Sequence, residues 1–406
     1  MPLPHALPAC RGALPQSRAR TDRGRGRPHR GLPPARRRRM TLVDASPGRP
    51  LDLAGSAYER GWQQAALCPD MVDHVRHAID HRLTETASAI ALPGVRDWID
   101  GQRRYTSAHY PDILEEIRGI AAGFGVTADA IFIYLHCSIA AELAGMAERA
   151  AEGCTSFAVT AGSSSIVAKN RDYRPEHIPI QRVFRHVDPA WTGRRILCVG
   201  SLGSPGNFSS GMNSDGFAVT DTNSRTTDHG VGMHRYFLLT WLLVNCRTVD
   251  DALAAIRGMM HTGGGLLLMG DAVGAVAAVE LGHRSVGIER RAAGRVSRTN
   301  HFVTPAMAGA NLVDQGYVAS HANSEARLPA VAALVRRADP EFGADQAAAI
   351  LAHHRDGKGE ALCRHGGADP GHTISASVYE TGRRRLYFAA GNPCAGAWQS
   401  FDFATN

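Results

Sequence analysis

The sequence predicts an α+β fold, in which sheets are covered by layers of helices. From about Gly55 to Ala151, apolar residues recur at helical spacing. From Cys154 onward the period changes to two, which is typical of short strands. Helical segments lie between these strands, and the chain contains no internal repeat. Runs of strands punctuated by paired helices indicate sheets with helical layers.

The helical half shows clear start and stop signals. Ile113, Ile117 and Ile120 share one face of an expected helix. Pro111 and Asp112 are suited to the start of this helix, and Gly123 and Gly125 are suited to its end. A further helix is expected from Asp129 to Ala144.

The second half alternates strands and helices. The expected strands are Thr155–Val159, Ile166–Ala168, Ile196–Val199, Phe217–Thr220, Leu266–Met269, Val276–Glu280, Ser285–Glu289, His372–Glu380 and Arg384–Ala389. The expected helices are His234–Cys246, Val249–Met259, Leu328–Arg337 and Asp345–His354.

Composition excludes several classes of protein. Of the 406 residues 44% are apolar and 20% charged, which is typical of a globular protein. The apolar runs are far shorter than the roughly 20 residues that a membrane span needs, so we expect no membrane partner. The net charge is +7, but residues 1–39 hold eleven Arg and one Asp, a balance of +10, which leaves 7 − 10 = −3 for residues 40–406. A mildly acidic body predicts no nucleic-acid partner.

Residues 1–39 are predicted to be a disordered Arg/Pro-rich extension. They contain seven of the 21 prolines and little apolar periodicity, so they cannot bury enough surface to fold. They also lack the apolar core of an export signal, and we expect a cytoplasmic protein. Because Met40 follows an arginine run, we expect translation to begin there. The alternative is a basic arm that binds nucleic acid, and deletion of residues 1–39 would test it.

The eight cysteines are widely and irregularly spaced, with no CxxC pair. This spacing argues against a structural zinc site and against a disulfide scaffold. We therefore expect reduced thiols, no metal and no cofactor.

Cys154 stands in a distinctive setting. It follows Gly153 at the junction of the two halves and begins an expected strand. One interpretation is a small buried residue at the start of a strand. The other is a nucleophile that cuts its own preceding peptide bond, because glycine gives the backbone the freedom that such a step needs. Cleavage would leave Cys154 with a free α-amine of pKa about 7.7–8.0, which suits a general base at neutral pH.

Several motifs in order along the chain resemble the acyl-coenzyme A:6-aminopenicillanic-acid acyltransferase family of autoproteolytic N-terminal-nucleophile (Ntn) hydrolases. More distantly they resemble choloylglycine hydrolases and penicillin V acylases. The motifs are Gly55–Gly61, Glu115–Gly123, Gly153–Ser156, Ala168–Tyr173, Gly211–Gly216, Thr299–Phe302 and Ala390–Cys394. The resemblance covers about residues 50–400.

The resemblance implies a fold and a domain organisation. The fold is the four-layer αββα sandwich of Ntn hydrolases with a helical N-terminal prosegment. Residues 40–153 would form this prosegment, the small subunit after autocatalytic cleavage between Gly153 and Cys154. Residues 154–406 would form the catalytic domain, the large subunit.

The resemblance also implies catalytic roles. Cys154 matches the nucleophile, and Asp172 matches the carboxylate that holds the amine of the nucleophile. Asn300 matches the asparagine that binds the oxyanion. Asn223 resembles a second asparagine near the nucleophile. Arg364 resembles an active-site arginine that stands late in the sequences of the family.

Lys169, Asn170 and Arg171 are the expected substrate-binding residues. Lys169 replaces an arginine of the choloylglycine branch. It keeps a positive charge near the thiol but lacks the planar fork of arginine, which favours the acyltransferase branch. Lys169 is also one of only two lysines in the chain, which contains 43 arginines.

We expect the protein to be made as an inactive precursor, a zymogen. Once cleaved, it would be a cysteine amidohydrolase or acyltransferase that passes an acyl group through a Cys154 thioester to water or an amine. The substrate would be a small-molecule amide, a peptide-like compound or an acyl-CoA. The two fragments would remain together as a heterodimer, and higher oligomers are left open. The alternative is an uncleaved, inactive Ntn-fold binding protein.

Overall fold

The computed structural model describes residues 41–42, 49–146, 153–337, 342–354, 361–366 and 371–404. The expected extension, residues 1–39, lies outside these ranges, as does Met40. Helices fill the first part of the described chain, as the sequence predicts. They are α1 (Ala57–Leu67), α2 (Val72–Ile90), α3 (Pro93–His109), α4 (Pro111–Phe124) and α5 (Ala128–Leu143).

The strands form two sheets. One has seven strands in the order β1-β15-β14-β13-β4-β3-β12, and the other has eight in the order β11-β10-β9-β8-β7-β6-β5-β2. Their bounds are β1 (Thr41–Leu42), β2 (Leu51–Ala54), β3 (Gly153–Ala161), β4 (Ser164–Asp172), β5 (Gln181–Val187), β6 (Arg195–Ser201), β7 (Ser210–Asn213), β8 (Ala218–Thr222), β9 (Leu266–Gly270), β10 (Val276–Leu281), β11 (Val286–Arg291), β12 (Arg295–Arg298), β13 (Thr373–Glu380), β14 (Arg385–Ala390) and β15 (Ala397–Phe401). Among these strands, the pairs are antiparallel except β1 with β15 and β2 with β5.

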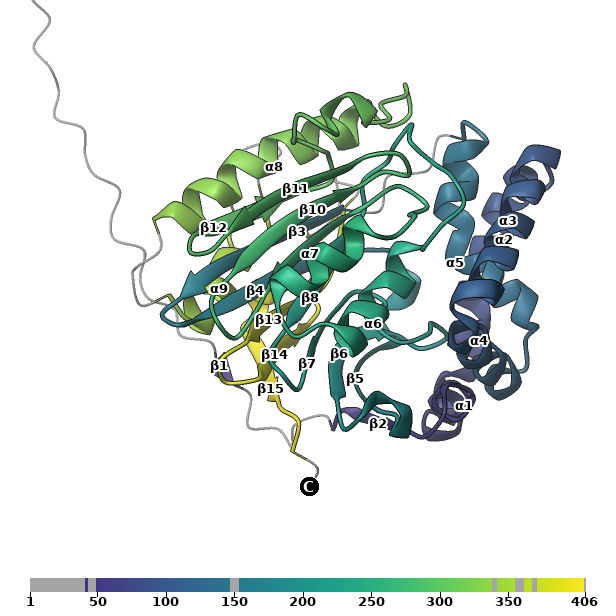
Figure 1. Cartoon of the computed structure of the whole chain (residues 1–406), viewed down its shortest axis with the longest axis horizontal. Coiled ribbons are helices and arrows are strands. Elements are labelled where there is room, and N and C mark those ends of the chain that lie inside the picture. The colour runs from purple at the N-terminus through teal and green to yellow at the C-terminus, as the bar shows by residue number, and fades with distance from the viewer. Residues whose placement is uncertain are drawn as a thin grey trace, which may run out of the picture. The chain divides into compact units, whose positions relative to one another are not determined.

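The two sheets pack face to face, and helices cover their outer faces (Figure 1). The second half of the described chain contributes α6 (Arg235–Asn245), α7 (Val249–Arg257), α8 (Val318–Arg336) and α9 (Ala344–Leu351). Helices α8 and α9 lie on the seven-stranded sheet, and α6 and α7 on the eight-stranded sheet. This arrangement confirms the predicted four-layer αββα sandwich.

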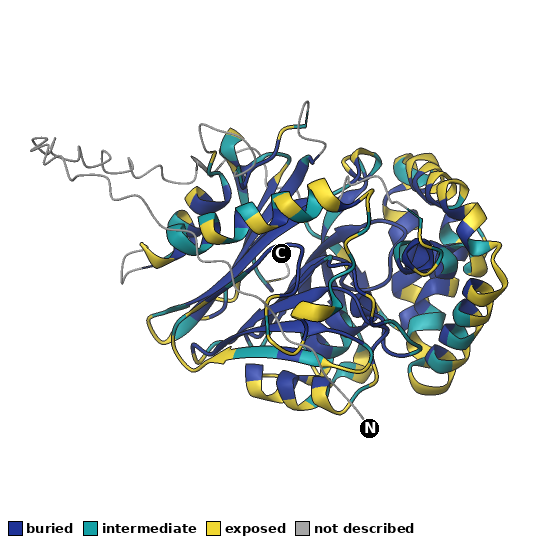
Figure 2. Ribbon diagram, turned by 90° about the horizontal axis from the view of Figure 1, so that it is seen from above, coloured by how far each residue is buried: buried dark blue, intermediate teal, exposed yellow. Residues whose placement is uncertain are grey.

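Strand alternation divides the core between the layers. In β3, Phe157 packs toward α8 and α9, while the next residue, Ala158, faces the other sheet. In β9, Leu267 packs toward the helices, and Leu268 faces the seven-stranded sheet. Because successive side chains point to opposite faces of a strand, both faces of both sheets are buried. Figure 2 shows the strands as buried, with exposed residues on the outer sides of the helices.

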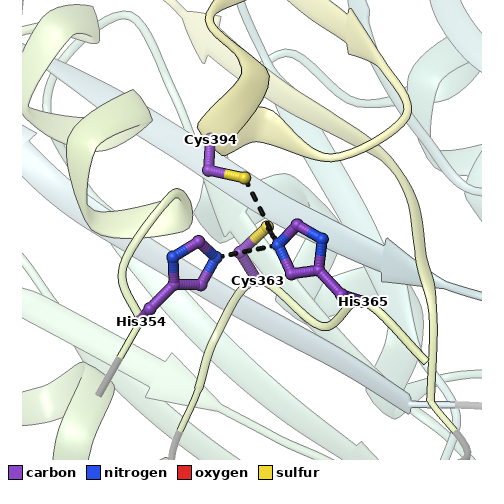
Figure 3. Close-up of side chains that lie close together, drawn as sticks. All are labelled: His354, Cys363, His365 and Cys394. Carbon is purple, nitrogen blue, oxygen red and sulfur yellow. Dashed lines mark hydrogen bonds between the residues drawn. The ribbon is translucent and has the colours of Figure 1, made fainter. Parts of the chain in front are cut away.

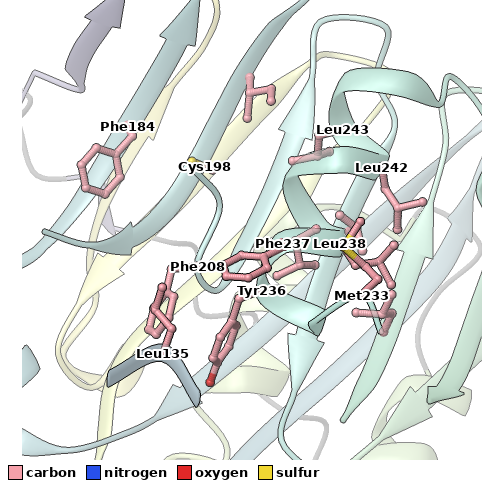
Figure 4. Close-up of a cluster of buried hydrophobic side chains, with 14 of the residues drawn as sticks. Leu135, Phe184, Cys198, Phe208, Met233, Tyr236, Phe237, Leu238, Leu242 and Leu243 are labelled. Atoms are coloured by element: carbon pink, nitrogen blue, oxygen red, sulfur yellow. The ribbon is translucent and has the colours of Figure 1, made fainter. Parts of the chain in front are cut away.

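Helices α1 to α5 share the largest hydrophobic core with α6, α7 and the eight-stranded sheet. Figure 4 shows a part of this core, where Leu135 of α5, Phe184 of β5 and Phe237 of α6 contribute side chains. The helical half is therefore packed against the sandwich through continuous apolar contact.

Two glycines allow α1 and α4 to pack in close contact. A Cβ atom at Gly119 would overlap the backbone carbonyl of Tyr58, and one at Gly61 would overlap that of Glu116. Since neither carbonyl can move without displacing its helix, both positions require glycine.

The start of α8 that the sequence predicted is wrong. The sequence predicted a helix from Leu328, whereas α8 begins at Val318 and continues through Pro329. The first half of α8 is polar and has no apolar stripe that would indicate a helix. Tertiary hydrogen bonds hold it instead, such as the one that Ser324 Oγ accepts from the Asn300 backbone N–H at 2.6 Å.

In the described part of the chain, no single helix is long and apolar enough to cross a membrane. Helices α4 and α5 meet that test only when joined, across a bend of 114°.

Gly119→Ala should destabilise the fold, because the added methyl group cannot fit between α1 and α4. We expect a loss of about 1–3 kcal/mol in the free energy of unfolding, measured by urea denaturation with circular dichroism. Gly94→Ala is the matched control, since its Cβ would meet no atom within 4 Å. Equal stability of the two variants would contradict the close packing.

Candidate active site

Pairing between β3 and β4 fixes the position of Cys154. In this antiparallel pair Gly153 lies opposite Asp172, and Cys154 lies opposite Arg171. Both strands are interior to the seven-stranded sheet, flanked by β12 and β13. Cys154 is only 7% exposed. The cysteine singled out by the sequence is thus a buried residue at the start of a central strand.

Asn300 contacts the backbone of Cys154 directly. Its Oδ1 accepts a hydrogen bond from the Cys154 N–H at 2.9 Å, and its Nδ2 donates to the Asn223 carbonyl at 2.8 Å. The structure therefore brings together the two asparagines that the sequence analysis named. In the intact chain the acceptor of the Cys154 N–H is Asn300, whereas the resemblance assigned the nitrogen to Asp172.

Arg327 is a site residue that the sequence analysis missed. Its Nη1 donates to the Cys154 carbonyl at 2.7 Å and to Thr155 Oγ1 at 2.8 Å, and its Nη2 donates to Asn300 Oδ1 at 2.7 Å. Burial and the neighbouring Arg364 lower the pKa of Arg327 to about 10, so the guanidinium stays charged at neutral pH. The only signal in the sequence was an arginine next to an expected helix.

Asp172 is fully buried and held by two groups. Its Oδ1 accepts from Thr373 Oγ1 at 2.6 Å, and its Oδ2 lies 3.4 Å from Arg364 Nη1. Burial raises the pKa of this carboxyl group, while Arg364 and Arg327 act in the opposite direction. A Cβ atom at Gly153 would overlap Arg364 Nη1. Glycine before Cys154 therefore leaves room for the arginine that pairs with Asp172.

Lys169 forms a buried ion pair beside the thiol. Its Nζ lies 2.6 Å from Asp221 Oδ1, and Asp221 Oδ2 lies 3.4 Å from Arg235 Nε. All three side chains are almost completely buried. Asp221 is therefore shared by two cations, and the three groups together keep a net positive charge beside the thiol.

The pKa of the Cys154 thiol is raised, mainly by burial. Lys169 lowers it, Asp221 and Asp172 raise it, and a hydrogen bond from the Asp172 backbone N–H favours the thiolate. The thiol of the intact chain is therefore protonated at neutral pH.

A pocket opens beside these groups. It is lined by Cys154, Lys169, Arg171, Asp172, Tyr173, Phe208, Asp221, Asn223 and Tyr236. The guanidinium of Arg171 lies over the rings of Tyr173 and Phe208, with centroid distances of 4.8 and 5.8 Å. Asn170 does not line the pocket, because strand alternation directs it to the other face of β4. There its Nδ2 donates to the carbonyls of Leu351 and Leu362, so Asn170 is a structural residue in this fold.

The model of the family described as "Acyl-coenzyme A:6-aminopenicillanic acid acyl-transferase" matches residues 159–395, more than half of the 406-residue chain. This chain belongs to that family. The matched region of this family member begins just after Cys154 and includes Asp172, Asn223, Asn300 and Arg364.

Solved structures of two kinds are similar to this acyltransferase-family chain. Two mutant forms of conjugated bile acid hydrolase from Clostridium perfringens each match with 12% identity over 62% of this chain. These matches span 92% and 97% of the two hydrolase chains, with TM-scores of 0.41 and 0.40. Penicillin V acylase from Agrobacterium tumefaciens matches with 11% identity over 58% of this chain and 82% of its own, with a TM-score of 0.36. A comparison with curated sequences finds no match.

Arg327→Met should destabilise the protein, because it removes one hydrogen-bond donor from each of three buried oxygen atoms around Cys154. We expect a loss of about 2–5 kcal/mol in the free energy of unfolding, measured by urea denaturation. Arg336→Met is the control, since Arg336 ends the same helix with its side chain exposed. A loss no larger than that of the control would show that the guanidinium is dispensable.

Proposed function

We propose that this protein is an Ntn-type cysteine amidohydrolase or acyltransferase, in which Cys154 forms an acyl thioester. One observation carries the proposal. Asn300 and Arg327 bind the backbone of a buried cysteine whose thiol borders a pocket, and a charged lysine lies beside it. The family of the chain supports the same chemistry.

The first step of the proposal is self-cleavage between Gly153 and Cys154. The Cys154 sulfur attacks the Gly153 carbonyl carbon, the thiol proton passes to the Cys154 nitrogen, and the C–N bond breaks. The products are a thioester on Gly153 and a free α-amine on Cys154. Water then hydrolyses the thioester, which releases the carboxylate of Gly153 and restores the thiol. Residues 40–153 would thereby become the prosegment fragment, and residues 154–406 the catalytic domain.

The contacts of the intact chain suit the product of this step. Asn300 Oδ1, already 2.9 Å from the Cys154 nitrogen, would orient the new α-amine toward the thiol. That amine would take the thiol proton during turnover and give it to the leaving group. Asn300 Nδ2 donates one N–H to Asn223, and its second N–H is the candidate oxyanion donor. Asp172 would anchor Arg364 beside the cleaved bond.

The pocket favours a small substrate with an apolar part and an anionic group. Tyr173, Phe208 and Tyr236 supply aromatic surface, and Arg171 supplies a cation. Among the described residues, no carboxylate forms an ion pair with Arg171. Of the three residues expected to bind substrate, Lys169 and Arg171 both line the pocket, and Arg171 is the stronger candidate because Lys169 is paired with Asp221. A small-molecule amide, a peptide-like compound or an acyl-CoA fits this description, with water or an amine as the acyl acceptor.

The chemistry needs no cofactor, since one residue supplies nucleophile and base. The two fragments would stay associated as a heterodimer, because α1 to α5 share one hydrophobic core with the sandwich. The seven cysteines within the described residues are all free thiols, which is consistent with the cytoplasmic location that we propose.

Self-cleavage predicts two fragments on a denaturing gel. Scaling 43.5 kDa by residue number gives about 27 kDa for residues 154–406, and about 16 kDa for residues 1–153 or about 12 kDa for residues 40–153. Amino-terminal sequencing of the large fragment should begin Cys-Thr-Ser-Phe.

Variants of Cys154 separate this function from the alternative of an uncleaved binding protein. Cys154→Ala should neither cleave nor turn over amide substrates, and Cys154→Ser should accumulate precursor because a hydroxyl group is a poorer nucleophile. Cys68→Ser is the control for a buried thiol outside the site. A wild-type chain that stays intact and inactive would favour the binding protein, whereas an active intact chain would refute the Ntn mechanism.

Lys169→Met should slow self-cleavage and move its pH profile to higher pH. The positive charge of Lys169 lowers the thiol pKa, so its removal raises that pKa and reduces the thiolate fraction at a given pH. The rate of cleavage of freshly purified precursor, measured between neutral and alkaline pH, tests this. A profile that is unchanged or moves to lower pH would exclude the lysine from thiol activation.

A further inference from the structure

Two histidines and two cysteines converge in the C-terminal part of the chain, on segments that flank Arg364 of the candidate active site. His354 follows α9, Cys363 and His365 belong to the segment 361–366, and Cys394 lies in the short helix η5 (Pro393–Ala395). Figure 3 shows the four side chains directed toward one another from these three segments. One ligand atom from each residue lies within 4.8 Å of all the others.

Hydrogen bonding among the four groups does not account for this geometry. His365 Nε2 lies 3.0 Å from His354 Nε2, 3.3 Å from Cys394 Sγ and 3.6 Å from Cys363 Sγ. A ring nitrogen has either one hydrogen atom or one lone pair, so it can bond to only one of these three neighbours. A cation between the four atoms would satisfy all of them together.

The three distances from His365 Nε2 are close to those in a tetrahedral metal site. Zinc bonds of about 2.0–2.1 Å to nitrogen and about 2.3 Å to sulfur place tetrahedral ligand atoms ~3.4 Å apart for two nitrogens and ~3.6 Å apart for nitrogen and sulfur. The observed separations of 3.0, 3.3 and 3.6 Å lie close to these values. Two imidazoles with two thiolates are a ligand set that selects zinc.

The backbone that carries these ligands is held by other contacts. The N–H groups of Leu362 and Cys363 both donate to the His353 carbonyl, at 3.1 and 3.2 Å. Asn392 Nδ2 donates to the Arg364 carbonyl at 2.7 Å and lies 3.4 Å from Cys363 Sγ. An N–H group directed at the sulfur would stabilise the negative charge of a metal-bound thiolate and orient it. The ligand atoms are therefore preorganised by the fold.

We propose that His354, Cys363, His365 and Cys394 bind one zinc ion in a structural site. Binding would release the two thiol protons, and the two thiolates would neutralise the 2+ charge. Four protein ligands complete the tetrahedron and leave no position for substrate, so the site is structural and not catalytic. Cys363 is buried, whereas both histidines are exposed, which gives the ion a path from solvent.

The site would link the C-terminal strands to the candidate active site. Arg364 stands between two of the ligands in sequence, and its guanidinium lies 3.4 Å from Asp172 Oδ2. An ion that ties the segment 361–366 to α9 and η5 would fix the position of this arginine. The proposal departs from the sequence-based expectation of no metal, which rested on the lack of a CxxC pair. The four ligands come from three separate segments, and spacing alone does not reveal them.

Elemental analysis of the full chain, purified without chelators or metal-affinity resin, tests the site. We expect about one zinc ion per chain in the wild type. The double variant Cys363→Ser/Cys394→Ser should lose it. Cys68→Ser, a buried thiol outside the cluster, should retain it, and so should Cys154→Ala, so the result does not depend on the proposed catalytic function.

Cobalt provides a second readout if the double variant fails to fold. Co²⁺ added to chelator-treated wild type should give the intense visible absorption of a tetrahedral thiolate site, and one equivalent of Zn²⁺ should abolish it. Wild type that stays free of zinc after incubation with it would overturn the proposal. The proposal would also be overturned if the double variant kept all of its zinc, or if bound cobalt did not give that absorption. A Cys363–Cys394 disulfide in protein purified under reducing conditions would overturn it as well.

Discussion

The register between β3 and β4 is the constraint on which the candidate site depends. By pairing Gly153 with Asp172, it places Cys154 beside the carboxylate of the neighbouring strand. It also directs Lys169 and Arg171 into the pocket and Asn170 away from it. A shift by one residue would exchange the two faces of β4. The hydrophobic layers on both sides of the sheet exclude such a shift, because Phe157 and Ala158 pack against different layers.

The buried charges around Cys154 form two groups. Asp221 lies between Lys169 and Arg235 on one side of the thiol, and Asp172 pairs with Arg364 on the other. An unpaired charge in such a place would be costly, so each group depends on segments that the fold brings together. The first group has two cations and one carboxylate and so keeps positive charge close to the thiol. Burial, which raises the thiol pKa, keeps the thiol protonated in the intact chain.

The segment 361–366 connects the two sites that the structure suggests. Arg364 reaches the candidate active site, while its neighbours Cys363 and His365 belong to the proposed zinc site. Asn170, which the sequence placed at the substrate, instead binds the Leu362 carbonyl from β4. The motif around Asp172 thus lines the pocket of the candidate active site on one face of the strand and holds this segment on the other.

The sequence by itself determined the α+β class and most of the strands, and it singled out Cys154, because periodicity and a glycine–cysteine junction are local patterns. It also named Asp172, Asn223, Asn300 and Arg364 through motifs, and the structure brings them together. Tertiary structure alone decided that Arg327, 173 residues from Cys154, binds its carbonyl, and that two cysteines and two histidines meet. Contacts between distant segments arise from the packing of layers, and no local pattern records which side chains that packing will join.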